Sequence, residues 1–233
     1  MRFLPVPLLL SLLALPLQAE GWRKISNEDG ILVETREVAD QEFPDLRGTT
    51  VIKGDVYELA ALIEDVDHTC DWAKRCMGSR VVKRISDVEM VFYSRTVAPW
   101  PAQDRDAYVH ALATGLDKGD DVTMRFETIK GAIAPVTEGV VRMPILKGHY
   151  RLVRIDDQNT KVEFQVHADI GGWIPGWLSQ MLSKAIPYDT LAGLRRHLPK
   201  VRQKYAEKVA KWQKIRAENL KPSSAPTAPA SPE

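Results

Sequence analysis

The segment that decides the fold is HADIGGWIPGWL, residues 167–178. Residues 160–169 alternate between apolar and polar side chains, which is typical of a strand with one buried face. Apolar residues then recur at helical spacing from Ile174 to Ile186. The two glycines end the strand, and Pro175 suits the first turn of a helix. The sequence therefore predicts a strand that turns sharply into a long helix, whose apolar face must pack against the sheet.

The rest of the chain predicts an α+β fold with many antiparallel strands. Asp55 caps an expected helix over residues 56–64. The expected strands lie at 22–26, 31–38, 46–53, 80–86, 88–97, 106–115, 121–129, 149–155 and 161–169. The C-terminal helical pattern continues to about Ala217, with interruptions at Pro187 and Pro199. A curved sheet around one long helix leaves a space, which small or flexible side chains would turn into a cavity.

The two ends of the chain are predicted to lie outside the folded part. Residues 1–19 read as a secretory signal, because an apolar run follows Arg2 and Leu17-Gln18-Ala19 is a plausible cleavage site. The alternative is a retained membrane anchor, for which the proline-containing run is short. Residues 221–233 are mainly Pro, Ala and Ser and are expected to be disordered. We therefore expect an exported protein, either periplasmic or secreted.

Two cysteines, Cys70 and Cys76, lie close together in a loop-like stretch. In an exported protein this spacing favours a local disulfide. Two free, buried thiols are the alternative, since sequence alone does not fix the geometry. His68 alone does not complete a zinc site with them.

Positive charge is concentrated at the C-terminal end. Ten Lys or Arg residues but only two acidic residues lie between Arg195 and Lys221. Within it, residues 200–220 have the pattern of a basic amphipathic helix, which can lie on an anionic membrane surface. A solvated helix face that only extends the fold is the other interpretation. We expect no nucleic-acid partner and a monomeric protein.

No motif in the sequence requires catalysis. It contains no Gly-x-Ser-x-Gly, phosphate-binding loop or His-Glu-x-x-His. The five histidines are separated in sequence: His68, His110, His149, His167 and His197. We expect no catalytic residue, metal or cofactor, and a protein that is not an enzyme.

A series of short motifs matches a known family in order and spacing. They are Asp29-Gly30-Ile31, Leu46-Arg47-Gly48, Trp72, Trp100-Pro101, Arg105-Asp106, Gly148-His149-Tyr150-Arg151-Leu152, Thr160-Lys161-Val162 and residues 169–175. The chain resembles the START domain, the steroidogenic-acute-regulatory-related lipid-transfer module, over residues 22 to about 205. One departure is Tyr150, where the family often has Trp. The basic extension is additional to the family pattern.

The resemblance implies a helix-grip fold over residues 20–199, in which a curved antiparallel sheet grips the C-terminal helix around an apolar cavity. It implies a carrier of one hydrophobic molecule, such as a sterol, a phospholipid or a similar lipid. Candidate cavity residues on the sheet are Met124, Phe126, Phe164 and Val166. Candidates on the helix are Trp173, Ile174, Trp177, Leu178, Met181 and Leu182. Arg105 either meets a polar headgroup or fixes the loop before its strand.

Two other functions are compatible with the same pattern. A grip-fold enzyme of the cyclase or hydrolase kind would need polar groups that converge in the pocket, such as His110 or His167 beside a carboxylate. An interaction module would fill the cavity with its own side chains. The presence of an open cavity would separate the interaction module from a lipid carrier.

Overall fold

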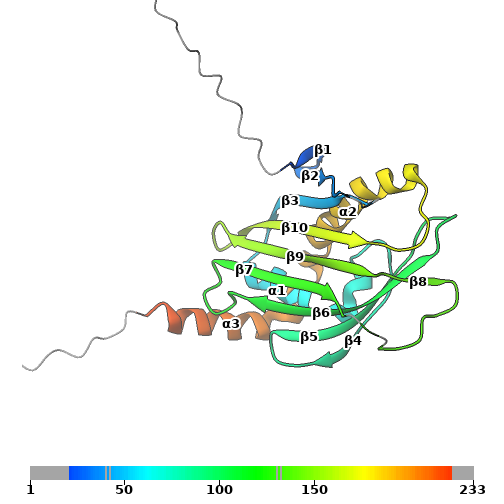
Figure 1. Ribbon diagram of the computed structural model, residues 1–233. Coiled ribbons are helices and arrows are strands. Elements are labelled where there is room, and N and C mark those ends of the chain that lie inside the picture. Colours follow the sequence, from blue (N-terminus) through cyan, green and yellow to red (C-terminus); the bar gives the residue numbers. More distant parts are fainter. Residues whose placement is uncertain (1–20, 40, 42, 130, 132, 222–233) are drawn as a thin grey trace, which may run out of the picture.

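The computed structural model describes residues 21–39, 41, 43–129, 131 and 133–221. In it, a curved sheet of ten strands packs with one face against a long helix (Figure 1). The strands are β1 (Arg23–Glu28), β2 (Ile31–Arg36), β3 (Asp45–Lys53), β4 (Cys76–Arg84), β5 (Glu89–Thr96), β6 (Asp104–Thr114), β7 (Asp121–Thr128), β8 (Val140–Arg142), β9 (Ile145–Arg154) and β10 (Asn159–Asp169). The helices are α1 (Val56–Glu64), η1 (Val66–Asp71), α2 (Gly176–Val201), η2 (Arg202–Tyr205) and α3 (Ala206–Asn219). The predicted fold class is confirmed.

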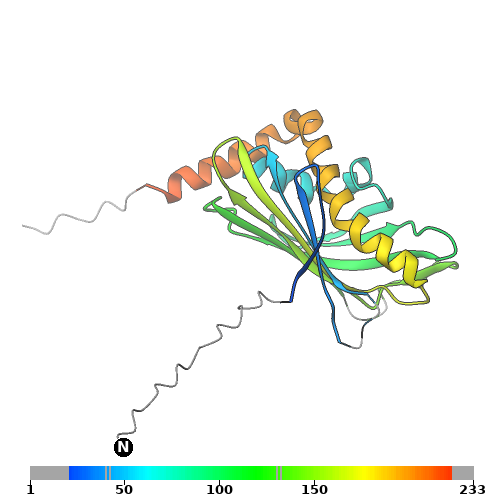
Figure 2. The same cartoon turned by 90° about the horizontal axis from the view of Figure 1, so that it is seen from above.

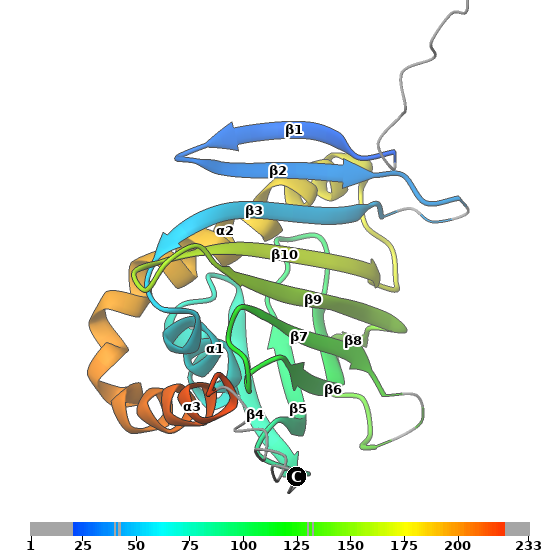
Figure 3. The same cartoon turned by 90° about the vertical axis from the view of Figure 1, so that its left-hand side faces the viewer.

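The sheet has the strand order β1-β2-β3-β10-β9-β7-β6-β5-β4, with all of these neighbours antiparallel. The short strand β8 pairs with β6 in parallel. Helix α2 lies across the concave side of the sheet, with α1 and α3 beside it (Figures 2 and 3). Sheet and helix therefore form the helix-grip arrangement that the family resemblance implies.

The segment at residues 167–178 makes the predicted turn from strand to helix. Along β10, Val162, Phe164 and Val166 are buried. Gly171 and Gly172 follow with positive φ angles of 59° and 64°, a conformation that glycine adopts without the steric cost of a side chain. The chain reverses there, and α2 begins at Gly176 and returns across the sheet.

Helix α2 is not interrupted where the sequence predicts it. It continues through Pro187 and Pro199 to Val201, beyond the expected end of the domain at residue 199. Pro187 is buried against β3, where a Cβ on Gly48 would lie only 2.9 Å from the Pro187 Cβ. Tight packing on the sheet thus holds the helix together across a residue that removes one helical hydrogen bond.

The disulfide-containing loop is shorter than predicted. Strand β4 begins at Cys76, four residues before the expected start at residue 80 and inside the loop-like stretch, because Cys76 pairs with Thr96 of β5. The Cys70–Cys76 disulfide is present, with the two Cα atoms 4.8 Å apart, and confirms that prediction. The predicted signal over residues 1–19 and the tail beyond residue 221 lie outside the described residues.

Candidate functional site

A cavity of about 320 Å³ lies between the concave face of the sheet and α2. The sheet contributes the inward-facing side chains of β5, β7, β9 and β10. These include Met90, Phe92, Met124, Phe126, Tyr150, Phe164, Val166 and Ala168. All four sheet residues that the sequence predicts for the pocket, Met124, Phe126, Phe164 and Val166, line this cavity. Period-two alternation was sufficient to place them, because every second side chain of a strand faces the same side.

Three aromatic rings form the central wall of the cavity. The ring centroids of Tyr150 and Phe164 are 4.9 Å apart, and that of Phe126 is 6.0 Å and 6.3 Å from these two. Strand register places Phe164 beside Tyr150 and Phe126 on the next strand. Burial raises the pKa of the Tyr150 hydroxyl above its ordinary value. The hydroxyl is therefore neutral, and this wall carries no charge.

Helix α2 contributes fewer of the predicted residues. Ile174, just before the helix, and Leu182 line the cavity, as does Ile186. Leu178 is fully buried in the hydrophobic core but is not part of the lining.

The predicted placement of three further side chains over the pocket is wrong. Trp173 is 69% exposed, Trp177 60% and Met181 41%. Residues 174, 178, 182 and 186 follow one helical stripe that faces the sheet. Trp177 and Met181 each precede a member of this stripe by one position, about 100° around the helix axis. The apolar character of Trp177 and Met181 did not by itself show that their side of the helix faces water.

Arg105 is 6% exposed and lines the cavity at one end of the sheet. Its guanidinium donates hydrogen bonds to three backbone carbonyls. These are Gln103 O, Ile170 O at 3.5 Å and Gly171 O at 3.2 Å. Burial lowers the pKa of Arg105 below its ordinary value, and the nearby Asp104 carboxylate only partly offsets this effect. The arginine thus fixes the turn before α2 while its charge remains next to the cavity.

The neighbouring arginines are paired with carboxylates. Arg95 Nη2 lies 2.8 Å from Asp104 Oδ2, and Arg142 Nε lies 2.5 Å from Asp106 Oδ1. Asp106 is almost fully buried. Arg105 is thus the arginine of this cluster that lies against the cavity and has no carboxylate partner among the described residues.

The wall formed by the disulfide loop and the strands β4 and β5 was not predicted from the sequence. The lining there includes Trp72, Arg75, Ser79, Phe92, Ser94 and Thr96. The alternation of residues 90, 92, 94 and 96 along β5 was a usable signal. The sequence carries no such signal for Arg75, because its position depends on how the Cys70–Cys76 loop folds against the sheet.

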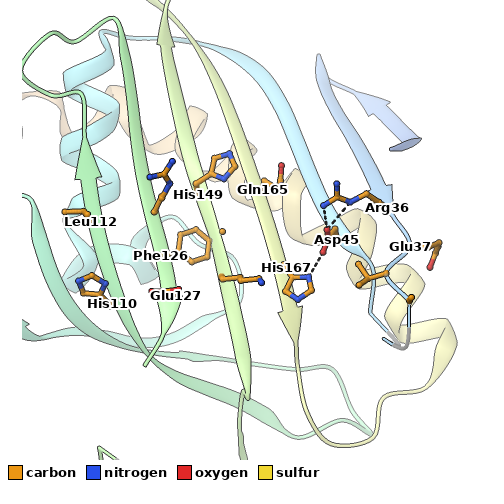
Figure 4. A pocket seen from close by; sticks show the side chains of 15 residues that line it. Arg36, Glu37, Asp45, His110, Leu112, Phe126, Glu127, His149, Gln165 and His167 are labelled. Carbon is orange, nitrogen blue, oxygen red and sulfur yellow. Dashed lines mark hydrogen bonds and ion pairs between the residues drawn. The ribbon is translucent and has the colours of Figure 1, made fainter. Parts of the chain in front are cut away.

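A separate groove of about 770 Å³ lies on the outer face of the sheet (Figure 4). Three histidines there or at its edge pair with carboxylates across strands: His110 with Glu89 at 2.7 Å, His149 with Glu163 at 3.2 Å and His167 with Asp45 at 2.6 Å. The hydrogen bond with His149 lowers the pKa of Glu163. His110 and His167 do therefore lie beside carboxylates, but on the side of the sheet opposite to the cavity.

The described residues contain no cluster of three or more His, Cys, Asp or Glu that could hold a metal ion. None of the described helices has the length and apolar character needed to span a membrane.

The basic C-terminal segment packs on the domain. Tyr205, Val209 and Trp212 are buried, and the Trp212 ring lies 5.9 Å from that of Tyr57 in α1. Five of its basic side chains pair with carboxylates: Arg202 with Glu58, Lys204 with Asp65, Lys208 with Glu64, Lys211 with Asp87 and Arg216 with Asp120. The segment therefore covers α1.

Comparison with known proteins identifies relatives with the same architecture. The START domain family model matches residues 10–204. An uncharacterized protein of Pseudomonas aeruginosa is 33% identical over 177 residues, which is 76% of this chain and 86% of that protein.

Solved structures of other proteins have the same fold. The STAR-related lipid transfer protein fragment of Xanthomonas axonopodis has 30% identity and a TM-score of 0.70, and the match covers 77% of this chain and 99% of that one. Human STARD10 shares the fold with a TM-score of 0.71 at 15% identity, covering 88% of this chain and 84% of that one.

Proposed function

The chain belongs to the START domain family, and on that premise we propose that it binds one hydrophobic lipid in the cavity under α2 and carries or presents it between membranes. The observation that carries the proposal is the cavity itself. Its volume of about 320 Å³ and its lining of aliphatic and aromatic side chains are typical of a ligand site. Binding there is favoured by about 25 cal/mol of free energy for each Å² of apolar surface that leaves water.

The cavity also favours a lipid carrier over a module whose interior is filled by its own side chains. The sheet wall and the α2 wall face each other across open space, with Phe164 on one side and Ile186 on the other. The description of the Xanthomonas relative as a lipid transfer protein supports the same function.

We propose that the protein acts by binding alone. The described lining contains no histidine, and its cysteine, Cys76, is held in the disulfide. Imidazole and thiol groups, two common acids, bases and nucleophiles of enzymes, are thus absent from the described cavity wall. The histidine–carboxylate pairs that the enzyme alternative requires lie on the outer face of the sheet.

We propose export to an oxidising compartment, either the periplasm or the exterior. The support is the predicted signal at residues 1–19 together with the Cys70–Cys76 disulfide, since disulfides persist in such compartments. Expression of the full chain followed by N-terminal sequencing tests this. Export predicts a mature chain that begins near Glu20, and an unprocessed chain retained in the cytoplasm would contradict it.

We also propose that residues 200–216 dock on an anionic membrane. Lys200 and Lys214 of this segment and Arg196, one turn before it in α2, are exposed and form no ion pair among the described residues. Each could contribute about 1 kcal/mol near an anionic surface, and salt would weaken the effect. Removing the whole segment would uncover α1, so the test is the triple Gln variant of these three residues in liposome co-sedimentation. Equal binding by wild type and variant at low salt would exclude this role.

The lipid-carrying proposal is tested by transfer between vesicles. Donor vesicles containing a fluorescent lipid and a quencher are mixed with acceptor vesicles, and transfer is followed as a rise in fluorescence. We expect the purified mature protein to accelerate transfer in proportion to its concentration. No acceleration, together with no lipid bound after incubation, would refute the proposal.

A further inference from the structure

The charges that line the cavity do not cancel. Its two carboxylates are both paired with cations. Glu64 lies 2.7 Å from Arg84 and 3.0 Å from Lys208, and Asp189 lies 3.3 Å from Lys74. The acidic groups of the lining are therefore already neutralised by the protein.

Three arginines of the lining have no such partner among the described residues: Arg125, which is exposed to solvent, and the more buried Arg75 and Arg105. Neither Arg75 nor Arg105 forms an ion pair with a carboxylate among the residues that the structure describes. The Nε atom of Arg75 is buried and has no hydrogen-bond partner there. The guanidinium of Arg105 reaches only backbone carbonyls, and burial lowers its pKa. Arg105 is buried and Arg75 is half-buried, and a cation withdrawn from water without a counter-ion is costly, which favours an anion beside it.

Strand register brings the two arginines to the same end of the sheet. Thr96 of β5 pairs with Cys76 of β4 on one side and with Arg105 of β6 on the other. Arg75 directly precedes Cys76, and its carbonyl accepts a hydrogen bond from Val97 N at 2.9 Å. Adjacent strands are about 5 Å apart, so the two backbones lie about 10 Å apart with Thr96 between them. Two long side chains can converge on one small group across this distance.

We propose that Arg75 and Arg105, with Thr96 between them, bind the carboxylate or phosphate headgroup of a single-chain anionic lipid. This inference rests on the proposed lipid-binding function and names the chemical class of the lipid. The acyl chain would lie along the wall formed by Phe126, Tyr150 and Phe164.

Two further hydrogen-bond donors of the lining fit this assignment. Trp72 is 7% exposed, and its Nε1 is buried without a partner among the described residues, as is Ser79 Oγ. Both are hydrogen-bond donors that an anionic headgroup can use. The Oδ2 atom of Asp189 also lacks a partner, but Lys74 neutralises its carboxylate. A volume of about 320 Å³ is at the small end of ligand pockets, which favours one chain over two.

The test compares lipids that differ only in headgroup charge. Nile red, an uncharged fluorophore, is bound in the cavity and displaced by palmitate, hexadecyl phosphate or methyl palmitate below their aggregation concentrations. We expect at least one of the two anions to bind wild type about tenfold more tightly than the methyl ester. The variant Arg75→Gln should lose about tenfold in affinity for that anion and keep its affinity for methyl palmitate.

Lys83→Gln is the matched control. It removes one positive charge from the exposed side of the same strand β4, and should leave all affinities unchanged. The lysine variant Arg75→Lys should recover part of the loss. Equal affinities of wild type for the ester and both anions would overturn the headgroup site while leaving lipid binding intact, and so would an equal loss of ester and anion in Arg75→Gln. Failure of every lipid and of Nile red to bind would refute lipid binding itself.

Discussion

At the scale of single residues, the side of a helix or strand on which a side chain lies decides its role. Leu182 and Ile186 reach the cavity, whereas Trp177 and Met181 on the same helix are exposed to water. A large apolar residue is therefore not by itself a sign of a binding site.

The variant Ile186→Trp should reduce lipid binding by filling the cavity. Ile186 lines open space, so the larger indole enters the volume that a ligand needs. We expect lipid affinity, measured by Nile red titration, to fall about tenfold or more with little change in the unfolding midpoint. The control Met181→Trp places the same ring on the exposed side of α2. If both variants bind as tightly as wild type, the ligand does not occupy this cavity.

The Glu163–His149 pair on the outer face should make stability dependent on pH. The hydrogen bond from His149 lowers the pKa of Glu163 below its ordinary value of 4.5. A carboxyl group with a lowered pKa in the folded protein adds to the free energy of unfolding above pH 4.5. This contribution disappears as the pH falls through the lowered pKa.

We expect Glu163→Gln to lower the free energy of unfolding by about 1 kcal/mol at pH 7, with the difference shrinking below pH 4.5. Urea unfolding at several pH values measures it. Glu127→Gln is the control, because Glu127 is exposed on the same face and forms no ion pair among the described residues. A difference between wild type and Glu163→Gln that stays constant down to pH 3 would contradict the assignment.

At the scale of elements, the loop between η1 and β4 links the disulfide to the cavity. It carries Trp72 and Arg75 into the lining, and Cys76 begins the strand that follows. The loop is short, so the disulfide removes little freedom from the unfolded chain. Its main effect is to fix where the loop meets the sheet.

The double variant Cys70→Ser/Cys76→Ser should fold with a moderately lower stability. We expect a loss of at most about 2 kcal/mol in the free energy of unfolding, measured in urea. Wild type treated with a reductant should lose the same amount, which separates the missing bond from the introduced serines. An unchanged midpoint in reduced wild type would show that the disulfide does not stabilise this loop.

At the scale of the whole molecule, the turn from the last strand into a helix that packs on the sheet was predictable because its signals are local. The alternation of β10, the glycine turn and the apolar helix from Ile174 are each visible within a few residues. The continuity of α2 through Pro187 was not predictable, because it depends on packing against Gly48, distant in sequence. The same limit applies to the cavity: strand pairing aligns Arg105 with Thr96 and Thr96 with Cys76, the residue after Arg75, and no short motif records this alignment.

The central claim is that one lipid occupies the space between the sheet and α2. Native mass spectrometry of the mature protein, purified without detergent, tests it most directly. We predict a population heavier than the polypeptide by the mass of one lipid, which denaturation removes and which Ile186→Trp reduces. Only the bare polypeptide mass, both as purified and after incubation with a total lipid extract of the producing cells, would contradict the claim.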